Sequence, residues 1–171
     1  FIFSSVPLKD TFDFNSVTFS PSSYSHDFRN SSFAIFSKTG TKLYGPAAIN
    51  TIWSGFGGQC QARNDGDPIV LYDSAADRWL ISPFTATNPY DECIAISQTG
   101  DPTGAWYRYA FQYSNFPDYP KLGVWPDGYY LTFNMFNAAG TSFTGGRVCA
   151  VDRNPMLTAS GTPGPIQCFQ L

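Results

Sequence analysis

The chain of 171 residues has no cluster of positive charge and no long apolar run. Its 10 Lys and Arg residues are scattered among 13 acidic ones, which argues against nucleic acid or an anionic membrane as the main partner. No stretch of about 18 apolar residues occurs, so we expect no membrane-spanning helix. Glu92 is the only glutamate. Because the other acids are aspartates, which favour turns over helix interiors, we expect little helix.

Aromatic residues, glycine and proline are abundant instead. Aromatics make up 18% of the chain, which also contains 15 glycines and 13 prolines. This composition is typical of short strands joined by turns, and it lacks the period of collagen or of a low-complexity sequence.

The strongest pattern is an internal repeat of short apolar segments separated by turns. Residues 33–40 (FAIFSKTG) match residues 93–100 (CIAISQTG), 60 positions later, with Ser, Thr and Gly identical. Residues 67–73 resemble 119–127, and residues 77–81 resemble 128–132, in the same order along the chain. Each of the two later copies therefore predicts four short strands. We expect them at 67–73, 78–84, 92–98 and 105–112, and then at 119–125, 129–136, 146–152 and 165–170.

Four antiparallel strands that repeat every 50–60 residues indicate an all-β fold of consecutive four-stranded β-propeller blades. A β-sandwich with chance similarity between strands is the alternative. Within one domain we distinguish four parts: an irregular segment with candidate first strands (1–32), a partial blade with a Gly-rich connection (33–66), and two blades (67–117 and 118–171). The apolar part of that connection, 45–66, is expected to pack over a blade face or a channel mouth.

A closed propeller needs about four to eight blades, more than the sequence supplies. A partial propeller would expose a whole sheet face to water, which is unfavourable. We therefore expect a partner that completes the sheet arrangement. Either the remaining blades of the same precursor or other copies of the chain would serve.

The four cysteines predict two disulfides, because no C-x-x-C pair is present and His26 is the only histidine. We expect Cys149–Cys168, since these residues fall on neighbouring strands, and then Cys60–Cys93; the other two connectivities stay open. Disulfides imply an oxidising compartment and hence a secreted, extracellular protein. Asn30, in Asn30-Ser31-Ser32, is a predicted glycosylation site.

Several motifs resemble those of a group of large secreted bacterial proteins that are propeller-like and mostly of unassigned function. The resemblance covers roughly residues 23–171 and implies an extracellular location and a longer parent protein. It implies no reaction. The motifs that carry it are 30–36 (NSSFAIF), 53–58 (WSGFGG), 64–70 (NDGDPIV), 77–79 (DRW) and 118–127 (DYPKLGVWPD).

The densest group of oxygen ligands is Asn64, Asp65 and Asp67, around Gly66. Calcium binds six to eight oxygens, and a glycine permits the tight turn that brings them together. The alternative is an Asx-rich turn that leads into a strand. Calcium is the one cofactor that the sequence suggests.

Candidate ligand-binding residues lie at the starts and ends of the predicted strands. Asp67 and Asp118 precede equivalent strands, where two carboxylates bind a cation or a sugar or act as acid and base. Tyr119, Trp125 and Trp53 are the aromatic candidates, because aromatic rings stack on sugars and anchor interfaces. We expect Trp53, beside a Gly-rich loop, and Trp125, before Pro126, to be exposed.

No catalytic motif stands out, so the leading hypothesis is a non-catalytic extracellular module for adhesion, carbohydrate binding or assembly into a larger surface structure. The first alternative is a glycan-active hydrolase or lyase that uses the carboxylates. The second is a structural subunit of an extracellular polymer.

Overall fold

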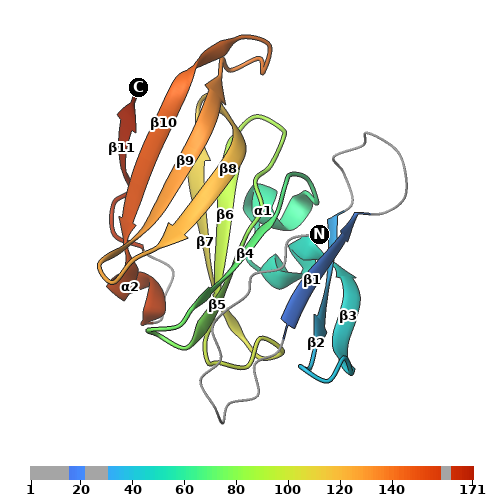
Figure 1. Ribbon diagram of the computed structural model, residues 1–171. Coiled ribbons are helices and arrows are strands. Elements are labelled where there is room, and N and C mark those ends of the chain that lie inside the picture. The colour runs from blue at the N-terminus through green and yellow to red at the C-terminus, as the bar shows by residue number, and fades with distance from the viewer. Residues whose placement is uncertain (1–15, 22–30, 159–162) are drawn as a thin grey trace.

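The computed structural model describes residues 16–21, 31–158 and 163–171, and its strands form three antiparallel sheets (Figure 1). In each sheet, strands that follow one another in the chain are neighbours. The first sheet holds β1 (Ser16–Pro21), β2 (Ser31–Phe36) and β3 (Lys42–Ala48). The second sheet holds β4 (Ile69–Asp73), β5 (Arg78–Ser82), β6 (Tyr90–Ser97) and β7 (Trp106–Tyr113). The third sheet holds β8 (Phe116–Val124), β9 (Gly128–Phe136), β10 (Phe143–Asp152) and β11 (Gln167–Gln170).

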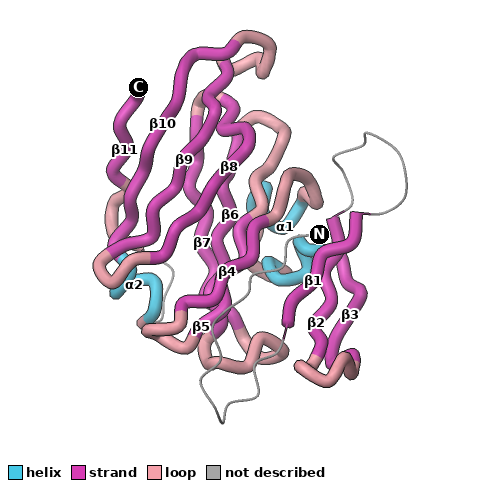
Figure 2. The backbone as a smooth tube through the Cα atoms, in the orientation of Figure 1, coloured by secondary structure: helices cyan, strands magenta, loops and turns pink. Residues whose placement is uncertain are grey.

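The all-β prediction is confirmed, as is the order of four antiparallel strands in each of the two later copies. Helix is confined to short segments (Figure 2). No helix in the described part of the chain is long and apolar enough to span a membrane. Asn30, the predicted glycosylation site, lies outside the described residues.

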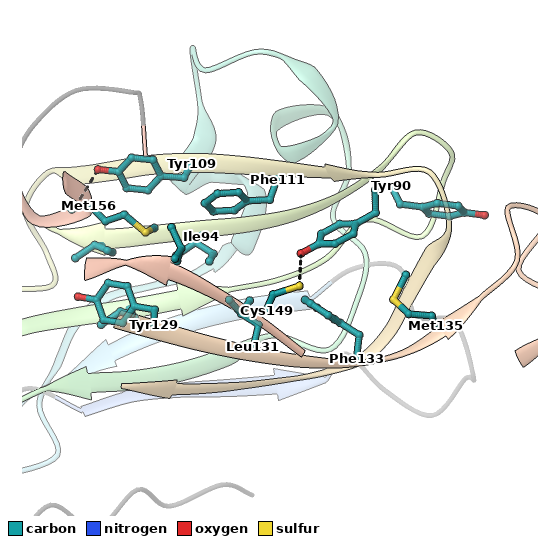
Figure 3. Close-up of a cluster of buried hydrophobic side chains, with 14 residues drawn as sticks. Tyr90, Ile94, Tyr109, Phe111, Tyr129, Leu131, Phe133, Met135, Cys149 and Met156 are labelled. Carbon is teal, nitrogen blue, oxygen red and sulfur yellow. Dashed lines mark hydrogen bonds between the residues drawn. The ribbon is translucent and has the colours of Figure 1, made fainter. Parts of the chain in front are cut away.

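The second and third sheets pack face to face over the larger apolar core (Figure 3). Strand β9 shows how the sequence builds this core, because its alternate residues Tyr129, Leu131, Phe133 and Met135 are buried, whereas Tyr130, Thr132 and Asn134 between them are exposed. Burying a large apolar side chain stabilises the fold by about 1.5–3 kcal/mol. The facing residues on the second sheet include Leu80, Ile94, Ile96, Tyr109 and Phe111.

A smaller apolar core joins the first sheet to the second. Phe33 and Ile35 of β2 face Ile81 of β5, and the connection after β3 fills the space beside them. That connection contains the 3-10 helix η1 (Ile49–Trp53) and the helix α1 (Gly58–Ala62). The prediction that this apolar connection packs over a sheet face is therefore confirmed.

Both predicted disulfides are present, and the structure contains no free cysteine. Cys60–Cys93 ties α1 to β6. Cys149–Cys168 joins two residues that lie directly opposite each other on β10 and β11. A disulfide stabilises mainly by restricting the unfolded chain, typically by about 2–4 kcal/mol. The two bonds are compatible with the predicted secretion.

Candidate functional site

The first strands of the second and third sheets, β4 and β8, contact each other (Figure 1). Asp67 lies just before β4 and Asp118 lies near the start of β8. Gly66, just before Asp67, has a left-handed φ of +82°, and an added Cβ would come within 2.6 Å of the Phe84 carbonyl oxygen, so this position requires glycine. The repeat therefore places the two carboxylates at the same edge of neighbouring sheets.

The two carboxylates are close enough to affect each other. Burial raises the pKa of Asp67, and the negative charge of Asp118 raises it further. Lys121 acts in the opposite direction and lowers it. The result is a carboxyl group that holds its proton more tightly than an ordinary aspartate does. Such a group beside a second carboxylate can share a proton or bind a polar ligand.

Strand β8 is irregular between Asp118 and Lys121, where its register with β9 shifts. Tyr119 lies in this irregularity with a φ of +52°, which is uncommon for a residue with a side chain. The residue is 56% exposed, and the Lys121 Nζ lies 3.4 Å from the centroid of its ring. A ligand that stacks on Tyr119 must therefore use the other face of the ring or displace the ammonium group.

The predicted exposure of Trp53 is wrong, whereas that of Trp125 is confirmed. Trp53 is fully buried in the smaller core, because Gly57 and Gly58 adopt positive φ and turn the chain back so that α1 reaches β6. Trp125 is 67% exposed but follows the last residue of β8, at the opposite end of that strand from Asp118. Of the five predicted ligand residues, the structure therefore brings together Asp67, Asp118 and Tyr119.

The structure gives the predicted calcium site no support. Asn64 Oδ1 accepts hydrogen bonds from the backbone N–H groups of Ile49 and Asn50, and Asn64 Nδ2 donates to the Ser31 carbonyl. Asp65 Oδ2 accepts from the Ala86 N–H. These bonds tie three segments together, as the alternative of an Asx-rich turn explains. Among the described residues, no three acidic, His or Cys side chains are grouped as metal ligands.

Sequence reasoning missed a cleft of about 400 Å³ between the first and second sheets. It lies beside β3 and β7. The only signal in the sequence is the short connection between the third and fourth strands of the second sheet. The lining residues used below are Tyr44, Thr51, Gln98, Thr103, Trp106 and Arg108.

No protein-family model, curated protein or solved structure matches this chain. The resemblance to large secreted bacterial proteins therefore stays a prediction. The function must be argued from the residues of the chain itself.

Proposed function

We propose that the chain forms consecutive β-propeller blades and acts as a non-catalytic, extracellular module that assembles through the outward face of its third sheet. The stacking of the three sheets supports the propeller, because one apolar core lies between the first and second sheets and another lies between the second and third. The contact between β4 and β8 supports it further, since the first strands of neighbouring blades meet at the centre of a propeller.

The observation that carries the assembly proposal is the group of apolar residues that this outward face presents beside the polar Thr132 and Asn134. Tyr130 of β9 is directly opposite Gly123 and Ala150 on the neighbouring strands, and Val148 is opposite Phe169 of β11. Small residues thus lie between large ones, as in a face shaped to receive side chains. Phe169 is 68% exposed, and Trp125 and Leu171 are also exposed.

Another sheet of the same build is the expected occupant of this face. Contiguous exposed apolar patches on soluble proteins mark interaction sites. The opposite face of the same sheet already packs against such a partner, the second sheet. When no other protein is present, a second copy of the chain supplies the sheet that binds this face.

We predict that the isolated chain self-associates and that Phe169→Lys weakens this association. A lysine at this position would have to lose its hydration in the interface. Sedimentation velocity across a concentration series measures the effect, with an expected rise in the dissociation constant of at least tenfold. Ala139→Lys, which adds the same charge at an exposed residue of the β9–β10 turn, is the matched control. A chain that stays monomeric at all concentrations, or equal association of both variants, would contradict the proposal.

The second candidate function is a glycan-active enzyme, favoured by the mutual influence of Asp67 and Asp118. A carboxyl group with a raised pKa suits a general acid, and a neighbouring carboxylate suits a base or nucleophile. This candidate predicts that the protein releases reducing sugar from a polysaccharide and that Asp67→Asn abolishes the release. Asp127→Asn, at an exposed carboxyl in the β8–β9 turn, is the control. Turnover that survives Asp67→Asn would exclude this pair as the catalytic groups.

A further inference from the structure

The cleft between the first and second sheets arises because two equivalent connections differ in length. These are the connections that follow β6 in the second sheet and β10 in the third sheet. Between the second and third sheets, the chain after β10 forms the helix α2 (Arg153–Leu157), which covers the outermost strand of the second sheet. Met156 of α2 is fully buried there, and the Tyr109 hydroxyl donates to its carbonyl oxygen at 2.9 Å. This corner of the molecule is therefore closed.

The equivalent corner between the first and second sheets is open. The chain after β6 returns to β7 through the short turn 98–105, which contains no helix. Tyr44 on β3 is 43% exposed, although its register partner Ile35 is buried. An aromatic side chain on the inward side of a sheet thus faces a cleft instead of a core.

The walls of the cleft are aromatic on both sides. Tyr44 packs on Phe33, with ring centroids 5.5 Å apart, and forms part of the wall from the first sheet. Trp106, the first residue of β7, forms part of the opposite wall and is half-buried against the smaller core. Both rings are held by packing on one side, so little side-chain entropy would be lost when a flat apolar surface binds between them.

Polar groups surround these aromatic walls. Gln98, Thr51 and Thr103 line the cleft. The Gln98 amide can donate and accept hydrogen bonds, whereas the Thr51 and Thr103 hydroxyls already donate to the Ala48 carbonyl oxygen and to Asp101 Oδ1 and offer acceptor lone pairs. Arg108 Nη1 donates to the Ser54 carbonyl oxygen at 2.7 Å, which fixes the guanidinium at the edge of the cleft. Among the described residues that line the cleft, Arg108 is the one that carries a charge.

The geometry points to a carbohydrate-binding site in this cleft that accepts a pyranose residue of a neutral or carboxylate-bearing glycan. A pyranose has apolar C–H faces that pack on aromatic rings and a rim of hydroxyls that needs mixed donors and acceptors. A volume of about 400 Å³ lies within the range of small-ligand sites. The positive charge of Arg108 disfavours an aminosugar and tolerates a uronic acid.

The first test screens the 171-residue chain on an array of neutral oligosaccharides, their uronic-acid counterparts and chitosan oligomers. We expect binding to members of the first two groups and none to the chitosan oligomers. The residues are then tested with Tyr44→Ala and Gln98→Ala, each expected to weaken binding about 5- to 10-fold. Trp125→Ala, which removes an exposed aromatic side chain of the third sheet, is the matched control and should leave binding unchanged.

A second measurement locates the ligand and reports folding at the same time. The chain has four tryptophans, so its ¹⁵N spectrum contains four indole signals, and Trp106→Phe identifies that of Trp106. On titration with cellobiose, lactose and mannobiose, the Trp106 signal should shift for at least one sugar, while the Trp125 signal, which Trp125→Ala identifies, keeps its position. A glycan array without binding, a shift of Trp125 instead of Trp106, or equal affinities of wild type and Tyr44→Ala would overturn the proposal. None of these outcomes depends on whether the chain self-associates.

Discussion

Glu92, the only glutamate of the sequence, lies fully buried on β6 in the layer between the second and third sheets. The Ser82 hydroxyl donates to its Oε1 at 2.5 Å, while Oε2 has no hydrogen-bond partner among the described residues. Burial raises the pKa of Glu92 to about 8, and the Ser82 bond offsets only part of this. Tyr113 lies near it, and burial together with the charge of Glu92 raises the pKa of that phenol. Glu92 is therefore mostly protonated at neutral pH.

We predict that Glu92→Gln makes the fold less sensitive to alkaline pH. The unfolded chain ionises at the usual value of 4.5 and the folded chain at about 8, so the unfolded state binds fewer protons between these values and stability falls as pH rises. One pKa unit corresponds to roughly 1.4 kcal/mol. Urea unfolding at pH 5 and pH 8 should show that the wild type loses at least about 2 kcal/mol relative to Glu92→Gln.

The matched control for this experiment is Asp127→Asn, which neutralises an exposed carboxyl in the β8–β9 turn. Its difference from the wild type should be similar at both pH values. If the difference between wild type and Glu92→Gln were also constant, the buried carboxyl would not ionise as the structure requires.

The strands of the second and third sheets were predictable from the sequence. Each predicted strand boundary lies within three residues of the observed one. The reason is local, because alternating apolar residues define the strands while Gly, Pro and Asp mark the turns. The Cys149–Cys168 pairing followed from the same strands. The approach of Asp67 to Asp118 was predictable too, since equivalent residues of a repeat occupy equivalent positions.

The short helices, the irregularity in β8 and the open cleft could not be predicted, because each depends on residues distant in the sequence. Trp53 begins a Gly-rich segment whose composition is typical of an exposed loop. The Cys60–Cys93 bond nevertheless holds this segment against β6. The cleft depends on the turn 98–105 being too short to cover Tyr44. Local periodicity in the sequence reveals neither the packing of the Trp53 segment against β6 nor the gap that the turn 98–105 leaves beside Tyr44.

Within the described part of the chain, one buried ion pair joins the second and third sheets in addition to their apolar core. Asp73, at the end of β4, accepts hydrogen bonds from Arg153 Nε at 2.6 Å and Nη2 at 2.9 Å, and from the Tyr129 hydroxyl at 2.9 Å. Burial alone would raise the pKa of Asp73, but the hydrogen bonds from Arg153, Tyr129 and the Ala76 N–H outweigh it and lower the pKa. The charge of Asp73 therefore depends on a residue 80 positions away.

We predict that Arg153→Met strongly destabilises the whole molecule, although methionine preserves most of the side-chain volume. The substitution leaves the Asp73 carboxylate buried without its cation, a change that typically costs about 3–5 kcal/mol. Because the pKa of Asp73 is lowered in the folded state, the stability that this pair supplies is present above the usual value of 3.8 and is lost as pH falls through the folded value. Urea unfolding at pH 7 measures the loss, and Arg63→Met, at an exposed arginine after α1, is the control.

The double variant Asp73→Asn with Arg153→Met should recover part of the stability, since it removes the uncompensated charge. A double variant less stable than Arg153→Met would show instead that Asp73 acts through its bonds to Tyr129 and the backbone, and that the two sheets do not depend on the ion pair.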